Sequence, residues 1–421
     1  MLIQVKTIFI VAICSFSVAR PLSIFRDTAT GLTHKDLLRE NRVAPTQLHN
    51  VTFVLHQQNM DQLIDILDDI SNPSSENYGK HMTRQEISDL TTIPNAQSEV
   101  TAYLEASGAS IMSETLNGEY ITASAPVSVW EEMFDTEFHT YTVLPSDRTD
   151  SYRREDDDSV RSYFRSDKYS VPTVIAAHVM SVLNTIQMPV MSSTHTSSKQ
   201  DVMLPAATNI IISPPKSVIS PLFSIKKFVT PSLLLTEYNV DSNTGDSLAS
   251  QAVLSAPSEL VNTRDISSFQ SFYHLPSQAI SSSIHGNVSS NSYCSMYQAK
   301  CSKSNAGVQY LMGLSPSPTT YGTIITDLSS WLLEVGNMES PPKVISINYG
   351  VDENLVTNSE FDAFDVQAIK LSLMGVTLVA AAGDNGANSA LAQGGKGYCG
   401  YTPQFPASSP YVLSVGSTMV S

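Results

Sequence analysis

Residues 376–388, Val-Thr-Leu-Val-Ala-Ala-Ala-Gly-Asp-Asn-Gly-Ala-Asn, decide the fold of the C-terminal half of this chain. The apolar run from Val376 to Ala382 predicts a strand buried on both faces, as in a parallel sheet. The run ends in a Gly-Asp-Asn-Gly turn at 383–386, which places one carboxylate just beyond the carboxyl end of the strand. Open α/β sheets form their active sites at this edge, so Asp384 is the first candidate site residue.

The composition indicates an acidic globular protein. The chain has 421 residues, of which 42% are hydrophobic and 15% charged, and its 40 acidic and 24 basic side chains give a net charge of −16. This length accommodates two or three domains of about 150 residues each. The negative charge argues against nucleic acid as a partner. It suits a protein kept soluble in an acidic lumen, where protonation of carboxylates reduces self-repulsion.

Residues 1–19 have the pattern of a secretory signal peptide. Lys6 precedes an apolar core at 7–14, and Ser-Val-Ala at 17–19 forms a small-residue cleavage site. The core is too short to span a membrane, and no later segment has about 18 consecutive apolar residues, so no membrane span is predicted. The expected location is outside the cell or in the lumen of a lysosome- or vacuole-like compartment.

Three cysteines follow the signal peptide. Cys294 and Cys301 are close enough in sequence to close a small loop in an oxidising compartment. Cys399 then has no partner among the remaining residues, and its partner is expected outside the printed sequence.

Residues 41–189 alternate between strand and helix patterns, which predicts an α+β domain of ferredoxin-like type. A strand pattern at 51–56 is followed by helical spacing of apolar residues over 60–70. Thr83-Arg84-Gln85-Glu86 has the form of a capping box at the start of another helix. Further helices are predicted over 100–108 and 129–134, and paired strands at 111–113 and 120–123.

The stretch at 190–227 is rich in Ser, Thr and Pro without sustained periodicity, and we interpret it as a linker. Strand and helix patterns alternate over 228–421, which predicts a parallel α/β domain. Within it, 344–350 has the pattern of a strand followed by a turn, and 361–374 that of the helix leading to the strand at 376–382.

Two sets of motifs resemble the sedolisin family, the acid-acting serine-carboxyl peptidases. The turn at 383–386 and Phe-Pro-Ala-Ser-Ser-Pro-Tyr-Val-Leu-Ser-Val-Gly at 405–416 are similar to its peptidase domain. Ser-Asn-Pro-Ser-Ser-Glu-Asn-Tyr-Gly-Lys-His-Met-Thr at 71–83 is similar to its activation prodomain. The resemblance implies a subtilisin-like α/β fold, a peptidase of tripeptidyl-peptidase or kumamolisin type, and a peptide or protein substrate. It also implies a prodomain at 41–189 that folds against the peptidase, blocks its cleft and is removed at acid pH.

The family activates its serine with a glutamate that an aspartate orients, and both precede a Val/Ile-Gln-Tyr string on one helix face. A carboxylate base with a pKa near ~4 works in acid, where an imidazole would be protonated. Here Val-Gln-Tyr-Leu-Met at 308–312 sets the alignment, so the glutamate position is Lys303 and the aspartate position is Gly307. A lysine ammonium cannot accept the serine proton, and residues 266–326 contain no Asp or Glu.

Some of the remaining family features occur in this sequence and others do not. Asp384 corresponds to the aspartate that donates a hydrogen bond to the oxyanion. The nucleophilic Gly-Thr-Ser-Ala turn and the family's C-terminal calcium loop do not occur before Ser421, so 228–421 is predicted to be the N-terminal part of the peptidase domain, an incomplete subtilisin-like sheet. No cofactor or metal site is predicted in this chain.

We therefore expect a member of a peptidase family that lacks peptidase activity. Two alternatives stay open at the level of sequence. One is a non-catalytic homologue that binds peptides or an active protease. The other is a truncated sequence of a diverged peptidase.

Overall fold

A computed structural model gives the fold of this chain. The predicted signal peptide at 1–19, the predicted linker at 190–227 and Cys399 lie outside the residues that the structure describes. The described residues are 23–29, 37–143, 162–188, 229–240, 243–255, 261–280, 282–285, 294, 298–316, 318–324, 331, 334–335, 338–384, 386–387 and 401–417.

The N-terminal unit, residues 23–188, is built around an antiparallel sheet with the strand order β4-β5-β3-β9. Two smaller antiparallel sheets, β2-β6-β7 and β1-β8, accompany it. Its strands are β1 (Ser23–Thr28), β2 (Leu37–Arg42), β3 (Leu48–Leu55), β4 (Ser110–Glu114), β5 (Tyr120–Pro126), β6 (His139–Val143), β7 (Ser162–Arg165), β8 (Lys168–Pro172) and β9 (Val179–Leu183). Its helices are α1 (Met60–Ser71), α2 (Arg84–Thr91), α3 (Ala96–Ala106) and α4 (Val127–Phe134).

A core of its own holds this unit together. Val51 and Phe53 point to the same side of β3, because side chains alternate along a strand, and both are fully buried. The rings of Trp130 and Phe134 stack with centroids 5.6 Å apart, and the Trp130 indole N–H donates to the backbone carbonyl of His49 over 2.8 Å. A large buried aromatic surface with its one polar group satisfied stabilises the unit from within.

The capping box predicted at the start of α2 is confirmed. The Thr83 hydroxyl accepts the Glu86 N–H, and the Glu86 carboxylate accepts the Thr83 N–H over 2.7 Å. Two N–H groups that the first turn of α2 would leave without partners are satisfied in this way, so the helix begins at Arg84.

The C-terminal unit, residues 229–417, contains the predicted parallel sheet, with the strand order β11-β12-β10-β13-β15-β17. Its strands are β10 (Ser250–Ser255), β11 (Ser282–His285), β12 (Thr319–Ile324), β13 (Val344–Asn348), β14 (Val351–Asp352), β15 (Thr377–Ala381), β16 (Gln404–Phe405) and β17 (Leu413–Val415). Its helices are α5 (Pro231–Glu237), α6 (Thr263–Phe272), α8 (Gln298–Leu314), the short η2 (Glu353–Leu355) and α10 (Asn358–Leu373).

The strand predicted at 376–382 is β15, but the prediction that it is buried on both faces is wrong. Leu378 and Ala380 are buried, because α10 packs on the face that carries them. On the other face Val379 is half-buried, and Thr377 and Ala381 are exposed. An apolar composition alone does not distinguish a strand covered on one face from a strand covered on two.

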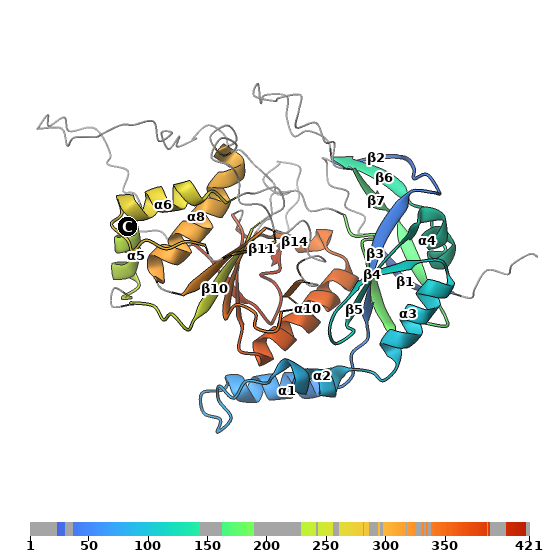
Figure 1. The fold of residues 1–421 in the computed structure, drawn as a ribbon, viewed down its shortest axis with the longest axis horizontal. Coiled ribbons are helices and arrows are strands. Elements are labelled where there is room, and N and C mark those ends of the chain that lie inside the picture. Colours follow the sequence, from blue (N-terminus) through green and yellow to red (C-terminus); the bar gives the residue numbers. More distant parts are fainter. Residues whose placement is uncertain are drawn as a thin grey trace, which may run out of the picture.

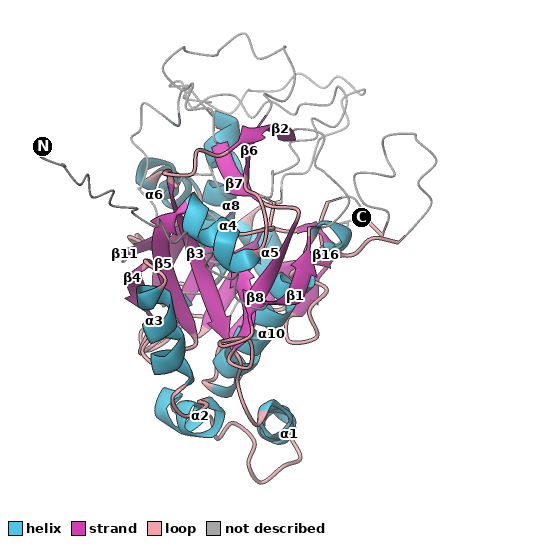
Figure 2. Ribbon diagram, turned by 90° about the vertical axis from the view of Figure 1, so that its right-hand side faces the viewer, coloured by secondary structure: helices cyan, strands magenta, loops and turns pink. Residues whose placement is uncertain are grey.

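Helix α10 lies between the two units. It contacts β15 of the parallel sheet on one side and α1 and β9 of the N-terminal unit on the other. Figure 1 shows α10 between the sheet that contains β10 and the strands of the N-terminal unit, with α1 and α2 below it. Figure 2, turned by 90°, places α1 and α2 at the same end of the molecule. The helix is therefore part of the interior of the whole protein.

The end of α10 has the geometry that requires glycine. Gly375 has φ +79° and donates to the Ser372 carbonyl, while the Val376 N–H donates to the Leu371 carbonyl. These are the two hydrogen bonds of a Schellman motif, which ends a helix with a left-handed residue. The His81 ring from the N-terminal unit covers this turn so closely that a Cβ at position 375 would lie 2.7 Å from His81 Cδ2.

Gly375→Ala is therefore expected to destabilise the protein. The left-handed conformation costs an alanine about 1 to 2 kcal/mol, and displacement of His81 adds to this cost. Urea unfolding measures the difference. Gly416→Ala is the matched control, because a Cβ there meets no atom within 4 Å. Equal stability of the two variants would contradict the role assigned to the Gly375 turn.

Candidate functional site

Gly307, at the predicted aspartate position, lies on α8 and faces the sheet. A Cβ at Gly307 would lie 3.2 Å from Asn348 Nδ2 and 3.3 Å from Val253 Cγ1. Asn348 is the last residue of β13, so position 307 faces the carboxyl edge of the parallel sheet. Lys303 precedes Gly307 by four residues on α8, which places the two positions on the same face of the helix.

Helix α8 is anchored on the remainder of its surface. Val308 and Met312 are buried in a cluster with Val253 and residues of α6. The Asn305 amide donates to Asp265 Oδ2 over 2.8 Å, and its oxygen accepts the Asn262 N–H over 2.8 Å. Residues two apart on a helix do not share a face. Asp265, the nearest acidic residue before the acid-free stretch, is therefore held away from the face that carries Gly307.

Asp384 lies at the same edge of the sheet as Asn348. It follows β15, which pairs in parallel with β13, and the residue is exposed. Gly383 before it has φ +97°, and a Cβ there would lie 2.6 Å from the amide of Gln404. The Gln404 amide donates to Asp352 Oδ1 over 3.2 Å, which fixes the side chain that packs against the turn.

The structure thus brings the α8 face and the Asp384 turn to one edge of one sheet. The disulfide expected between Cys294 and Cys301 is also confirmed, with an S–S distance of 2.06 Å and Cα atoms 5.7 Å apart. It closes the start of α8, the helix that carries Lys303 and Gly307. Among the described residues, there is no group of three or more His, Cys, Asp or Glu side chains arranged to hold a metal.

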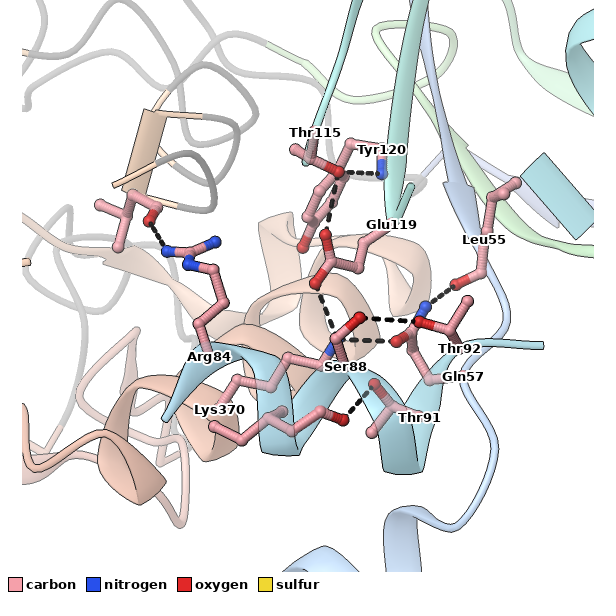
Figure 3. Close-up of polar contacts among 12 residues, drawn as sticks. Leu55, Gln57, Arg84, Ser88, Thr91, Thr92, Thr115, Glu119, Tyr120 and Lys370 are labelled. Carbon is pink, nitrogen blue, oxygen red and sulfur yellow. Dashed lines mark hydrogen bonds and ion pairs between the residues drawn. The ribbon is translucent and has the colours of Figure 1, made fainter. Parts of the chain in front are cut away.

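A second polar site, buried between the two units, is centred on Lys370 of α10 (Figure 3). Its ammonium donates to Glu119 Oε1 over 3.0 Å and to Gln57 Oε1 over 2.6 Å. The other Glu119 oxygen accepts the Thr115 hydroxyl over 2.9 Å. Lys370 and Glu119 are 4% and 6% exposed, so a pair from opposite units is sealed from water.

The electrostatics of this pair are set by burial and by each partner. Burial alone would raise the pKa of Glu119, but the Lys370 charge and the hydrogen bonds from Lys370 and Thr115 outweigh it and hold that pKa below its ordinary value. Burial lowers the pKa of Lys370, and Glu119 opposes that shift. With its pKa lowered, Glu119 is a carboxylate at neutral pH and favours the charged form of Lys370, so we assign the charged pair there.

A third polar contact lies where α10 begins. The Thr357 N–H donates to Glu360 Oε2 over 2.9 Å and the Thr357 hydroxyl accepts the Glu360 N–H, which forms a capping box. The Thr357 hydroxyl also donates to Glu360 Oε2 over 2.9 Å. The N-terminal unit adds Asp27, whose carboxylate accepts the Ser359 N–H over 3.2 Å, and Gln187, whose amide donates to the Ser359 hydroxyl over 3.2 Å. An acidic group at a helix N-terminus is stabilised by the backbone N–H groups there.

Glu360 has a strongly shifted pKa at this contact. The residue as a whole is half-buried, but burial of its carboxyl raises the pKa to about 7. The Thr357 hydrogen bonds and the Arg165 charge act against the shift, and Asp27 adds to it. The carboxyl is therefore neutral in mild acid.

Comparison with known proteins adds to this geometry. Residues 35–188 match the model of the pro-kumamolisin activation domain. The chain is 25% identical over 395 residues to tripeptidyl-peptidase 1 of Homo sapiens, covering 90% of this chain and 62% of that protein. It is 27% identical over 394 residues to tripeptidyl-peptidase 1 of Rattus norvegicus, with the same two coverages.

Two solved structures also match. One is Pseudomonas sedolisin, a serine-carboxyl proteinase, with a TM-score of 0.35 and 17% identity, covering 44% of this chain and 52% of that one. The other is the epidermin leader peptide processing serine protease of Staphylococcus aureus, with a TM-score of 0.37 and 11% identity, covering 88% of this chain and 70% of that one.

The fold is a mixed α/β fold with a parallel sheet, preceded by an activation domain. The chain belongs to the sedolisin family and is pro-kumamolisin-like. It spans 62% of the length of the tripeptidyl-peptidases that it matches.

The sequence pointed to the α8 positions and to Asp384, and it did not point to Lys370 and its partners. One signal was present, since Lys370 stands between Ile369 and Leu371 in a helix predicted to lead into a buried strand. A lone cation inside an apolar stretch indicates a buried partner. That partner, Glu119, lies 251 residues away in sequence, and no local pattern identifies it.

Lys370→Met is expected to destabilise the protein by about 3 to 5 kcal/mol at neutral pH, because it leaves the Glu119 carboxylate buried without a counter-charge. Lys370→Met with Glu119→Leu removes both charges and is expected to recover most of that loss. Urea unfolding measures both variants. Arg39→Met, in an exposed pair with Asp167, is the control with little expected effect. Equal loss in the single and double variants would contradict the pairing.

Glu360→Gln is expected to flatten the pH dependence of stability. The pKa of Glu360 is about 7 in the folded protein, above its ordinary value of 4.5, so its contribution is complete below the ordinary value and is lost as pH rises through the folded pKa. The stability of the wild type relative to the variant should therefore fall as pH rises from about 4.5 to about 7. Urea midpoints across the range measure it, and a constant difference would contradict the shifted pKa.

Proposed function

We propose that this chain is a tripeptidyl-peptidase-like member of its family whose C-terminal unit does not hydrolyse peptides. The observation that carries the proposal is the position of Gly307, which faces Asn348 at the active edge of the sheet and has no side chain to orient a base. Position 303 on the same helix face is a lysine. A protonated amine at acid pH has no lone pair with which to accept the serine proton.

The described residues at this edge can stabilise an oxyanion, but they include no base that removes a proton from a nucleophile. Asp384 follows β15 at the position of the oxyanion aspartate. A carboxyl there can donate a hydrogen bond to a developing oxyanion when protonated. Without a carboxylate pair on α8, nothing at positions 303 and 307 activates a nucleophile, and catalytic groups that act as a unit lose nearly all activity together.

Two further assignments belong to this proposal. The N-terminal unit is of ferredoxin-like type, an interpretation supported by its sequence of strands and helices and by the strand order β4-β5-β3-β9. The protein acts outside the cell or in a lysosome- or vacuole-like lumen, an interpretation supported by the Cys294–Cys301 disulfide. Among the residues that the structure describes, none of the helices is long and apolar enough to cross a membrane.

The purified chain is expected to release no tripeptides from a fluorogenic tripeptidyl substrate between about pH 3 and pH 6, the range in which a carboxylate base titrates. Asp384→Ala is the matched control, and its background rate should equal that of the unmodified chain. Thermal unfolding of both proteins shows that each is folded. Turnover by the unmodified chain that Asp384→Ala abolishes would overturn the proposal.

A further inference from the structure

The two units share hydrophobic clusters. Leu63 and Ile87 of the N-terminal unit are buried in one cluster with Ile369 and Leu373 of α10. A second cluster joins residues of the β3-β5-β9 strands to α10 and the parallel sheet; its members from the N-terminal unit are Val54, Tyr120 and Leu183. The face of α10 that the N-terminal unit covers is thus part of the core.

Polar contacts hold both ends of α10. At its start Ser359 contacts Asp27 and Gln187, and in its last turn Lys370 contacts Glu119. At its end the Leu373 carbonyl accepts the Met82 N–H over 2.8 Å. The N-terminal unit therefore satisfies backbone and side-chain groups at both ends of the helix, besides covering its apolar face.

We propose that the N-terminal unit is a permanent structural half of this protein, which stays docked on α10 in acid as it does at neutral pH. This differs from the expectation that the family resemblance carries, in which the activation domain is removed at acid pH. The proposal goes beyond the proposed function and does not depend on it, because docking is measured without any peptide substrate.

The first physical reason is that two apolar clusters cross the contact. Burial of apolar surface stabilises the contact without any titrating group, so lowering the pH leaves it unchanged. Separation would expose Ile369 and Leu373 on one side and Leu63 and Ile87 on the other. Full burial of each such side chain is worth about 1.5 to 3 kcal/mol.

The second reason concerns the start of α10. Protonation in mild acid removes the cost of burying a charged carboxylate there and does not break the contact between the units. The carboxyl of Glu360 is raised in pKa to about 7 by burial, so its neutral form is the one that the folded structure prefers. Asp27 and Arg165 face it from the N-terminal unit. Partial burial and Asp27 also raise the pKa of Asp362, two residues further along α10. Protonation of Glu360 and Asp362 thus favours the docked state.

The third reason concerns the charges along the rest of the helix. Glu119 has a lowered pKa, so its contribution is present above its ordinary pKa and is lost only as pH falls through the lowered value. Arg84 remains a guanidinium cation at any pH of interest and donates to the backbone carbonyls of Val335 and Met338. His81 lies against Gly375 at the end of α10.

The test uses the full chain with the recognition site of a sequence-specific viral protease inserted between Pro205 and Ala206. The uncut protein should unfold thermally at the wild-type temperature. After complete cleavage, verified on a non-reducing denaturing gel, the two pieces are run by size exclusion at neutral pH and at about pH 4, below the ordinary pKa of a glutamate. The pieces are expected to co-elute in equal amounts at both pH values. Separation at about pH 4 overturns the proposal, as does separation at both.

Two variants show whether the shared cluster is responsible. Leu63→Arg places a charge in the cluster with Ile369 and Leu373, so its cleaved pieces are expected to separate. Leu116→Arg is the matched control, because Leu116 belongs to the same unit and is 73% exposed, and its pieces should co-elute like those of the wild type. Co-elution of the Leu63→Arg pieces would overturn the role assigned to the cluster. If Leu63→Arg fails to fold, the cleaved wild-type chain at about pH 4 still decides.

Discussion

The structure depends on the burial of α10 between two units that are far apart in sequence. An ammonium such as that of Lys370 costs several kcal/mol to remove from water unless a partner of opposite charge meets it. Glu119 supplies that partner from the N-terminal unit, and Gln57 satisfies a further proton. The opposite face of α10 packs on the parallel sheet, where it contacts Leu378 and Ala380. One helix therefore couples the stability of the activation domain to that of the sheet.

This coupling changes how acid acts on the protein. A surface held mainly by exposed ion pairs would weaken as carboxylates are protonated. Here two apolar clusters cross the contact, and Glu360 at the start of α10 prefers its neutral form. His49, buried in the separate core of the N-terminal unit, acts in the opposite direction, because burial lowers its pKa to about 4 and charging it in acid is unfavourable. The net effect of pH on the whole chain is the balance between these groups.

At the carboxyl edge of the parallel sheet, two glycines lie where neighbouring side chains approach the backbone closely. Even a Cβ at position 307 would be in tight contact with Asn348 and Val253. Gly383 precedes Asp384 in a conformation with positive φ, and Gln404 packs against it. The backbone of a site is determined by strand order and turn geometry. Its chemistry is determined by the side chains placed on it, and these can be exchanged without changing the sheet.

Local patterns in the sequence determined the helices, the capping box at Thr83 and the disulfide, because each depends on residues close together in the chain. The alternation of strand and helix patterns predicted the parallel sheet, whose strands pair across longer separations. The alignment of 308–312 likewise determined the positions of Lys303 and Gly307. Only the tertiary structure decided that β15 is covered on one face and that Lys370 meets Glu119. Pairing across 251 residues and the shift in the Glu360 pKa arise from desolvation when separate segments meet, and no local pattern records that burial.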